Sequence, residues 1–543
     1  MSAWNFASVW EEIARIQPER AAIVHDGTEL SWSEFAERSD RLGSSLAARG
    51  VACGAKVAQY LYNTPEYLES LFACFKYSYV PVNTNYRYVA DELRYLWSDA
   101  DVEVVIFHGS FTVTIESIRN ELTGITQWVW VDDASGPCPD WAVPYESLVA
   151  KANAVDVEED EHRRARSGDD LYLLYTGGTT GKPKGVMWRQ DDLFVVLNRT
   201  ALVRYPEDGG IESIATTLAV AGNERGRVLP AAPLMHGTAA FSAFGMLSAG
   251  GAVVLCRGSK FDVEELLDTL ADARCTDVAI VGDAFARPIL DALDREPDRW
   301  DLSALRVMLS SGVMWSAQVK DGLIAQLPDL LCVDTLGSSE AVGLARSISS
   351  NRGTAKTAGF KLGSEARVIR EDGTSVTPGS GEVGLVAIAG RGPIGYLGDP
   401  EKSARTFREI DGLRWTTPGD NATVDADGSV RLLGRGSGCI NTGGEKVFPE
   451  EVEEVLKMHP RVVDAVVVGT PDTRFGEMVV GFAQLDPGSA LESEELLEFC
   501  RSHLAAYKIP RRLTMVADIG RAANGKVDQA RWKAIACEPN TGR

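Results

Sequence analysis

The sequence predicts an α/β protein with a large N-terminal domain and a small, mobile α+β domain at the C-terminus. The large domain is expected to combine α/β-layered sheets with a β-rich subdomain. Three observations predict this organisation: the length, an alternation of apolar runs with amphipathic stretches, and two changes in the sequence pattern toward the C-terminus. At 543 residues the chain exceeds the size at which one hydrophobic core stops growing.

The alternation covers residues 56 to about 336. Short apolar runs are expected as strands at 56–61, 102–107, 128–131, 253–256, 277–281, 305–309 and 331–335. Amphipathic stretches between several of them, such as 263–273 and 285–293, have helical spacing. Strands that alternate with helices form largely parallel, buried sheets, so this region is expected to be α/β-layered.

The pattern of apolar runs and turn signals changes beyond about residue 361 and again after Gly434. Short runs separated by turn signals, such as Glu371-Asp372-Gly373, predict the β-rich subdomain. The last part, of about 110 residues, has domain size and predicts a helix at 450–457, a strand at 462–468 and a helix at 493–504. We therefore expect domains at 1–434 and 435–543, with Arg435-Gly436-Ser437-Gly438 as the hinge segment between them, because small residues absorb backbone rotation easily.

Composition limits the classes of function. The formal net charge of −22 argues against a general nucleic-acid binder, which needs a basic surface. No apolar run is long enough to span a membrane, and the start resembles no signal peptide. The nine cysteines have no zinc or CxxC spacing, which is typical of reduced thiols. A cytoplasmic protein is expected, with a homodimer as a possible assembly.

A loop rich in glycine, threonine and lysine follows the apolar run at 171–175. It reads Thr176-Gly177-Gly178-Thr179-Thr180-Gly181-Lys182-Pro183-Lys184-Gly185. Glycines let backbone N–H groups form a concave anion site, and the hydroxyls and lysines add donors and charge for phosphate. A plain surface turn explains the glycines but not the threonines and lysines. The glycine spacing differs from that of a Walker A motif, so the loop predicts another type of phosphate site.

This loop resembles the phosphate-binding signature of the adenylate-forming superfamily, which includes acyl-CoA synthetases, firefly-type luciferases and peptide-synthetase adenylation domains. Other segments resemble the family's motifs and follow its order over nearly the whole chain. They are 233–237, 310–314, 334–340, 415–420, 434–453 and 521–526. The resemblance implies the family's fold, ATP and coenzyme A as co-substrates, and Mg²⁺ on the ATP phosphates.

The resemblance assigns a nucleotide site. Glu340 and Thr176 are the expected Mg²⁺ ligands, hard oxygen donors of the kind that this ion prefers. Asp420 would accept hydrogen bonds from both ribose hydroxyls, and Arg435 would contact the ribose. Leu336 stands where the family usually has tyrosine. The residues expected to bind ATP or AMP are Thr176, Gly177, Gly178, Thr179, Thr180, Gly181, Lys184, Ser311, Gly312, Asp334, Thr335, Leu336, Gly337, Ser338, Ser339, Glu340, Asp420, Arg435 and Lys526.

The remaining motifs concern the acyl group and the second substrate. A single histidine in an apolar stretch is usually a packed core residue, but the order of the motifs favours a place for His236 at the acyl pocket, where it would guide the carboxylate. Gly443 and Gly444 are expected beside coenzyme A. Lys526, after a turn glycine, resembles the family's catalytic lysine. The expected catalytic set is Lys526, Glu340, Thr176 and His236.

The resulting prediction is an AMP-forming acid–thiol ligase that makes acyl-AMP and then passes the acyl group to coenzyme A. Steroid side-chain acids or medium- and long-chain fatty acids are the expected substrates. Three alternatives stay open: transfer to the pantetheine of a carrier protein, a non-catalytic nucleotide-binding regulator, and oxidative luciferase chemistry. Arg501, Lys508, Arg511 and Arg512 are a further basic cluster, which is either a contact for coenzyme A phosphates or a solvated face.

Overall fold

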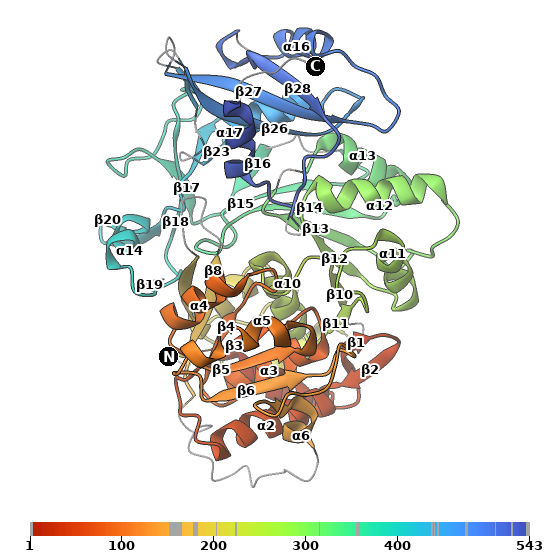
Figure 1. The fold of residues 1–543 in the computed structure, drawn as a ribbon, viewed down its shortest axis with the longest axis vertical. Helices are drawn as coiled ribbons and strands as arrows, with labels where there is room; N and C mark the ends of the chain where they lie inside the picture. The colour runs from red at the N-terminus through yellow and green to blue at the C-terminus, as the bar shows by residue number, and fades with distance from the viewer. Residues whose placement is uncertain are drawn as a thin grey trace.

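The computed structural model describes residues 4–150, 166–176, 183–201, 203–222, 225–313, 315–353, 359–435, 438, 440–442, 445–472, 476–504, 506–522 and 525–538. Its layers follow the chain from one end of the molecule to the other (Figure 1). The N-terminal sheet and its helices are at one end, and a small C-terminal unit is at the other. Between them lie most of the strands and helices of residues 227–435, together with β1 (Ala21–His25) and β2 (Thr28–Ser31).

An eight-stranded, mostly parallel sheet forms the N-terminal layer. Its strands in spatial order are β19 (Gly395–Tyr396), β9 (Lys184–Arg189), β8 (Leu171–Thr176), β4 (Val80–Asn83), β3 (Lys56–Tyr60), β5 (Val102–His108), β6 (Gln127–Val131) and β7 (Val143–Pro144). Neighbouring residues belong to different cores: Val104 and Ile106 pack on one face, whereas Val105 and Phe107 pack on the other. The sheet is therefore buried on both faces, as the continuous apolar runs predict.

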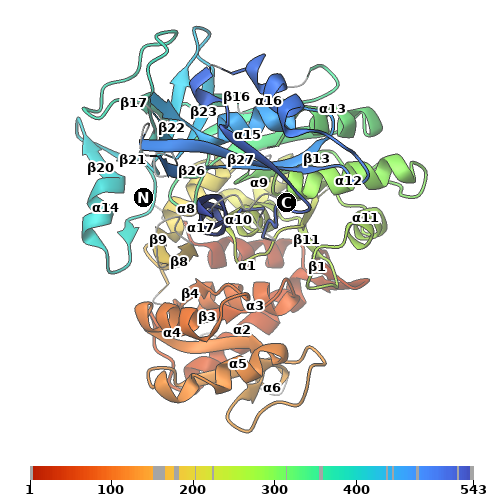
Figure 2. The ribbon, with the colours of Figure 1, turned by 45° about the horizontal axis from the view of Figure 1, so that its top comes forward.

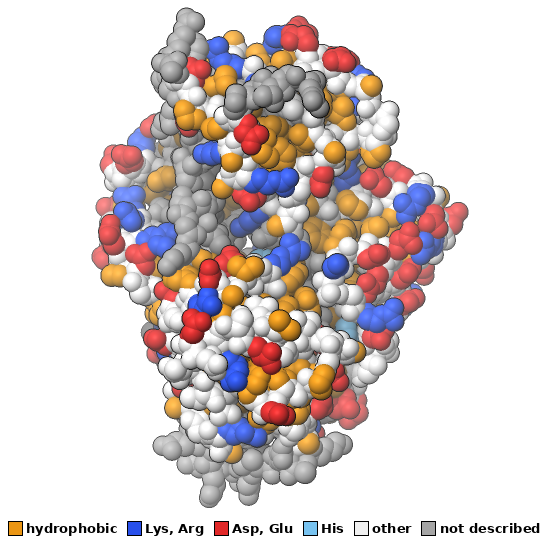
Figure 3. All heavy atoms as spheres, in the orientation of Figure 1, with side chains coloured by type: hydrophobic (Ala, Val, Ile, Leu, Met, Phe, Trp, Pro, Cys, Tyr) orange, Lys and Arg blue, Asp and Glu red, His pale blue; other side chains and the backbone are white. Residues whose placement is uncertain are grey.

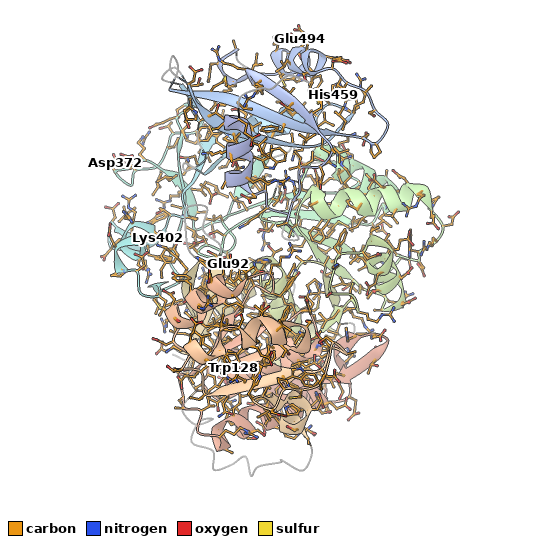
Figure 4. The ribbon with its side chains drawn as sticks, viewed as in Figure 1. Glu92, Trp128, Asp372, Lys402, His459 and Glu494 are labelled. Atoms are coloured by element: carbon orange, nitrogen blue, oxygen red, sulfur yellow. The ribbon has the colours of Figure 1, made fainter. Side chains whose placement is uncertain are left out.

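Helices cover both faces of this sheet. Residues of α3 (Pro65–Lys76) belong to the core on one face, and Leu96 and Trp97 of α4 (Ala90–Asp99) belong to the core on the other. Trp128 of β6 lies inside this layer (Figure 4). The other helices of the region are α1 (Phe6–Ile16), α2 (Trp32–Ala48), α5 (Thr112–Glu116), α6 (Tyr145–Val149), α8 (Gln190–Asn198) and α9 (Ser213–Val220), with 3₁₀ turns at Gly109–Phe111 and Arg119–Glu121.

A second sheet runs through the middle of the molecule. Its strands in spatial order are β2 (Thr28–Ser31), β1 (Ala21–His25), β11 (Ala252–Leu255), β10 (Arg227–Pro230), β12 (Asp277–Ile280), β13 (Val307–Ser311), β14 (Leu331–Leu336), β15 (Ala345–Ser349), β16 (Gly359–Leu362), β23 (Val430–Arg435), β22 (Asp420–Val424), β18 (Gly384–Ala389), β21 (Leu413–Thr416) and β20 (Phe407–Ile410), and β17 (Ala366–Ile369) pairs with β18. The pairs from β1 to β14 are parallel except β1 with β2, and those from β14 onward are antiparallel. The predicted change from α/β layering to a β-rich subdomain thus corresponds to a change from parallel to antiparallel strand pairing.

Helices α10 (Gly237–Ser248), α11 (Val263–Asp272), α12 (Asp283–Arg295) and α13 (Ala317–Gln326) connect the parallel strands, and α14 (Pro400–Thr406) lies beside β19 and β20. The outer ends of α11 and α12 carry mixed acidic and basic side chains (Figure 3). Glu264, for example, pairs with Arg295 and Arg299 at 3.1 Å each. These charges neutralise one another, so this face is an ordinary solvated surface.

The small C-terminal unit has its own sheet and cores. The sheet contains β25 (Glu445–Val447), β24 (Ile440–Thr442), β27 (Gly476–Leu485), β26 (Val462–Asp472) and β28 (Arg512–Val516). Helices α15 (Pro449–Lys457) and α16 (Ser493–Arg501) cover one face, and α17 (Gln529–Cys537) covers the other. A 3₁₀ turn is at Ala506–Lys508. Each strand and helix predicted from the sequence is found within a few residues of its expected place, and the α/β fold class is confirmed.

The described helices include none that is long and apolar enough to cross a bilayer. The eight cysteines that the structure describes are all free thiols. Domain limits at 434 and 435 remain a prediction of the sequence.

Gly43 gives a test of the packing between α2 and the segment after α3. A Cβ on Gly43 would lie 2.1 Å from Cδ2 of the buried Tyr77 ring, so we expect Gly43→Ala to cost about 1–3 kcal/mol of stability through overpacking. Gly245 in α10 is the matched control, because a Cβ there meets nothing within 4 Å. Thermal unfolding should show a lower midpoint for Gly43→Ala and an equal or higher one for Gly245→Ala; equal midpoints would contradict this packing.

Candidate active site

The two ends of the predicted phosphate loop lie at one edge of the N-terminal sheet. Thr176, the last residue of β8, pairs in register with Lys184, the first residue of β9. Because β8 is parallel to β4, the loop begins at the carboxyl edge of the sheet, where ligands of open α/β sheets bind. Gly177, Gly178, Thr179, Thr180 and Gly181 lie outside the described residues.

A buried asparagine fixes the end of β8. The side-chain amide of Asn83 donates to the carbonyl oxygens of Tyr175 at 2.9 Å and Met235 at 2.7 Å, and its oxygen accepts from the Tyr175 N–H at 2.6 Å. Asn63 holds the next segment similarly, since its oxygen accepts from the Leu234 N–H at 2.7 Å. Asn83 thus connects the 233–237 segment to the end of β8. Sequence reasoning missed both asparagines; their only signal is a polar side chain where an apolar run ends.

His236 lies at the start of α10, where its extended backbone serves as the N-cap. Burial, together with the smaller effect of the positive charges of Lys526 and Arg87, lowers the pKa of His236 to about 4. The imidazole is therefore neutral at physiological pH. Two cations near a neutral ring make this place favourable for an anion.

Lys526 reaches the large unit although it follows the last strand of the small sheet. The turn before it is closed by hydrogen bonds from Gly525 N to Ala522 O at 2.8 Å and from Ala522 N to Lys526 O at 2.9 Å. Gly525 has φ +70°, and a Cβ there would lie 2.9 Å from Val281 Cγ1 and 3.1 Å from Val313 Cγ2. In Figures 1 and 2 the blue chain before α17 descends toward β13 and α12. The structure thus brings Lys526 and His236 together.

Glu340 is held in a polar network behind the loop. Its carboxylate accepts from the Tyr396 hydroxyl at 2.8 Å, and the neighbouring Ser339 carbonyl accepts from the Trp188 indole N–H at 2.8 Å. The ammonium group of Lys402, on α14 (Figure 4), lies over the Tyr396 ring, 4.5 Å from its centre. Glu340 is 8% exposed. A carboxylate fixed in this way is suited to hold a cation at a defined place.

Lys184 has a different environment from the one predicted. Its ammonium group forms an ion pair with Asp399, the N-cap residue of α14. Its charge is therefore compensated by a carboxylate in this structure, and a direct contact with phosphate stays a prediction. The pair connects β9 to α14 and so supports the wall behind Glu340.

The strand ends of β13 and β14 lie next to one another, as predicted. Ser311 pairs with Thr335 in the parallel register, and Gly312 follows with φ +88°. Asp334 is 5% exposed and lies 3.9 Å from the buried Lys320 ammonium group. Burial raises the pKa of Asp334 to about 7, although Lys320 opposes the rise. Asp334 therefore belongs to the packed interior of this edge.

Leu336 packs into an apolar cluster with Ala341, Leu344 and Phe360, so the residue that replaces the usual tyrosine is part of the core. Gly337, Ser338 and Ser339 continue from it. Ser338 accepts from the Glu340 N–H at 3.2 Å and closes a turn with Ala341. This turn presents Glu340 toward Tyr396.

Asp420 and Arg435 are directly opposite in the register of β22 and β23. Asp420 is 8% exposed and follows Gly419, which has φ +97°. The side chain of Arg435 lies outside the described part of the chain, as do Ser437, Gly443 and Gly444. Of the basic cluster at the C-terminus, Arg501 pairs with Glu494 and Glu498, and Lys508 pairs with Glu451. These two cations are compensated, which fits the solvated-face interpretation.

The residues present fit Mg²⁺ better than a transition metal. Among the described residues no group of three histidine, cysteine or acidic side chains could hold a metal. One carboxylate, Glu340, and one hydroxyl, Thr176, are hard oxygen donors. Mg²⁺ is usually bound by one or two such groups together with the phosphates of a substrate.

The fold and the site together define the class of adenylate-forming enzymes. Residues 10–395 match the AMP-binding enzyme family, and residues 451–526 match the AMP-binding enzyme C-terminal domain. The chain belongs to this family. The predicted class, an AMP-forming acid–thiol ligase, is confirmed by curated relatives over nearly the full length.

Three relatives are informative. A 3-oxocholest-4-en-26-oate–CoA ligase of Rhodococcus rhodochrous is 38% identical over 98% of this chain and 95% of the relative. A medium/long-chain-fatty-acid–CoA/3-oxocholest-4-en-26-oate–CoA ligase of Mycobacterium marinum is 36% identical over 98% and 96%. The medium-chain acyl-CoA ligase Mig of Mycobacterium avium is 36% identical over 98% of both chains.

Solved structures agree with the fold. The anthranilate CoA ligase AuaEII with anthranoyl-AMP has a TM-score of 0.82 at 22% identity and covers 99% of this chain and 98% of that one. ATP-bound MatB from Rhodopseudomonas palustris has a TM-score of 0.78 at 25% identity, with 98% and 99% covered.

The effect of the Lys526 charge on His236 gives a prediction for solution. Removal of a nearby positive charge favours protonation, but burial is the larger cause of the low pKa, so the pKa of His236 should rise modestly above about 4 in Lys526→Ala. Titration of the His236 ring proton by NMR measures this shift. Lys508→Ala, which removes a lysine elsewhere in the small unit, should leave the pKa unchanged. Identical titrations of wild type and Lys526→Ala would show that the lysine does not dock in solution.

Proposed function

We propose that this protein is an ATP-dependent ligase that joins a steroid side-chain acid, or a medium- or long-chain fatty acid, to coenzyme A through an acyl-AMP intermediate. The observation that carries the proposal is the docking of Lys526 beside His236 and Arg87 at the edge where the phosphate loop begins. Two anions must meet in the first step, and this is the place where positive charge gathers.

In the first step a carboxylate oxygen of the acid attacks the α-phosphorus of ATP, and the bond to pyrophosphate breaks. Lys526 stabilises charge on the acid and the α-phosphate, because both anions would otherwise repel each other. The neutral His236 borders the carboxylate without adding a charge of its own. Glu340 and Thr176 would hold Mg²⁺, which supplies charge neutralisation for the departing phosphates when it is bound. Asp420 and Arg435 would hold the ribose.

In the second step the thiolate of coenzyme A attacks the acyl carbon, and the bond to AMP breaks. Lys526 has no task here. We propose that the small unit turns about Ser437, withdraws Lys526, and brings Gly443 and Gly444 beside the thiol arm. Separate arrangements for the two steps protect the reactive acyl-AMP from water.

The relatives' names support the choice of acid, because two of the three name 3-oxocholest-4-en-26-oate as a substrate and one of these also names medium- and long-chain fatty acids.

A cytoplasmic location and a homodimer belong to the proposal as well. Free thiols throughout the described residues support a reducing compartment. Light scattering on the purified protein would measure its oligomeric state directly.

Lys526→Ala is the main test. We expect ATP–pyrophosphate exchange to fall about 10²–10³-fold, because a positioned charge is lost, while transfer from synthetic acyl-AMP to coenzyme A stays within about twofold. The paired assays separate the two steps. Equal exchange rates in wild type and variant would refute the catalytic role. ATP binding without pyrophosphate release for any acid would instead favour a regulator.

Substrate choice is tested by pyrophosphate release across a panel of acids. We expect a steroid side-chain acid to give the highest kcat/KM, followed by medium and long fatty acids, with acetate lowest. A preference for acetate would exclude both substrate classes. Faster transfer to a carrier-protein pantetheine than to coenzyme A would favour the alternative acceptor.

A further inference from the structure

Arg521 begins the turn that presents Lys526. Its guanidinium group forms a two-pronged ion pair with Asp464 of β26, with Nε 2.5 Å from Oδ2 and Nη2 2.8 Å from Oδ1. The remaining nitrogen, Nη1, donates to the carbonyl oxygen of Gly525 at 2.9 Å. One side chain thus connects the sheet of the small unit to the residue directly before Lys526.

The pair is largely removed from solvent. The side chains of Arg521 and Asp464 are 16% and 18% exposed. Glu453 of α15 is 9% exposed, and it accepts a hydrogen bond from the Val467 N–H at 2.8 Å. Burial raises the pKa of Glu453, and the nearby charge of Arg521 partly opposes this rise. A guanidinium group that donates to a carboxylate and to a carbonyl oxygen at the same time is held in one orientation, and its charge is compensated.

A carboxylate of the large unit lies within electrostatic range of the same arginine. Burial lowers the pKa of Arg521, Asp464 and Glu453 raise it, and Asp283, the first residue of α12, adds a smaller effect in the same direction as these two carboxylates. Its Oδ1 accepts from the Ser316 N–H at 2.9 Å, whereas its buried Oδ2 has no hydrogen-bond partner within the part of the chain that the structure describes. Asp283 follows Val281 by two residues, and Val281 is the residue that Gly525 contacts.

We propose that Arg521 is a positioning residue for acyl-AMP formation, which shapes the Lys526 turn through Asp464 and aligns the docked small unit through Asp283. This inference rests on the proposed function. It adds a residue that contacts none of the substrates and acts only by positioning Lys526.

The two partners of Arg521 act at different moments. Asp464, Gly525 and Arg521 all belong to the small unit, so their contacts shape the turn in every arrangement of the two units. Asp283 belongs to the large unit, and its attraction for Arg521 exists only while Lys526 is docked. The first contact therefore affects how Lys526 is presented, and the second affects how often the docked arrangement is occupied.

The experiment measures the two half-reactions separately in Arg521→Met and Asp283→Asn. With the best acid of the panel, ATP–pyrophosphate exchange should fall about 100-fold in Arg521→Met, as expected for a displaced reacting group. It should fall about 5–10-fold in Asp283→Asn, within the usual range of a coupling between two sites. Transfer from the matching synthetic acyl-AMP to coenzyme A should stay within about twofold of wild type in both variants.

Arg461→Met is the matched control, because Arg461 pairs with Glu495 in the same small unit without contacting the Lys526 turn. It should leave both half-reactions unchanged. Arg521→Lys keeps the charge but loses the fork, and it should recover only part of the exchange rate.

Unchanged exchange in Arg521→Met, or an equal loss of both half-reactions in a variant with wild-type thermal unfolding, would overturn the proposal. If Arg521→Met does not fold, the proposal is tested by Asp283→Asn alone, because this substitution lies in the large unit and keeps the shape of the side chain. A wild-type rate of ATP–pyrophosphate exchange in Asp283→Asn would then refute the role of Asp283 in aligning the small unit. Wild-type protein that makes no acyl-AMP from any acid would refute the proposed function instead, since these variants are compared only with an active wild type.

Discussion

The arrangement depends on one close approach, that of Gly525 to Val281 and Val313. A lysine on a small, separately folded unit can serve a site on the large unit only if the chain before it comes within van der Waals distance of the large unit. Any Cβ at position 525 would collide with one valine and crowd the other. Glycine also tolerates the positive φ that turns the chain toward His236. The absence of a side chain at one residue therefore determines where a charge is placed.

The organisation of the cores allows this contact to be made and broken. The apolar residues of the small unit form two clusters of their own, one on each face of its sheet. Neither cluster includes a residue of the large unit, so separation of the units exposes neither core. The junction described here consists of small apolar contacts and charged groups, which resembles interfaces that open and close.

Sequence reasoning predicted the elements well because each predicted strand is a short apolar run and each helix has one apolar side. It also singled out Lys526, His236 and Glu340, since the order of the motifs resembled that of a known family, and their roles remain predictions. It did not find Asn83, Tyr396 or Asp464. Each of these acts through a partner 56 to 152 positions away in the chain, and nothing local to an asparagine or tyrosine specifies that partner. Lys184 shows the opposite case, in which a correct motif did not reveal the competing carboxylate of Asp399.

The neutrality of His236 is itself part of the mechanism of docking. Lys526 lowers the pKa of His236, and by reciprocity a proton on His236 must weaken the docking of Lys526 to the same degree. Because burial is the main cause of the low pKa, the imidazole carries no charge at neutral pH and does not oppose the approach of the lysine. The net charge of −22 would favour a cation almost anywhere on the surface, whereas at His236 two cations lie near a buried ring that adds no charge of its own. The low pKa of His236 therefore allows positive charge to gather at a site that must attract a carboxylate and a triphosphate together.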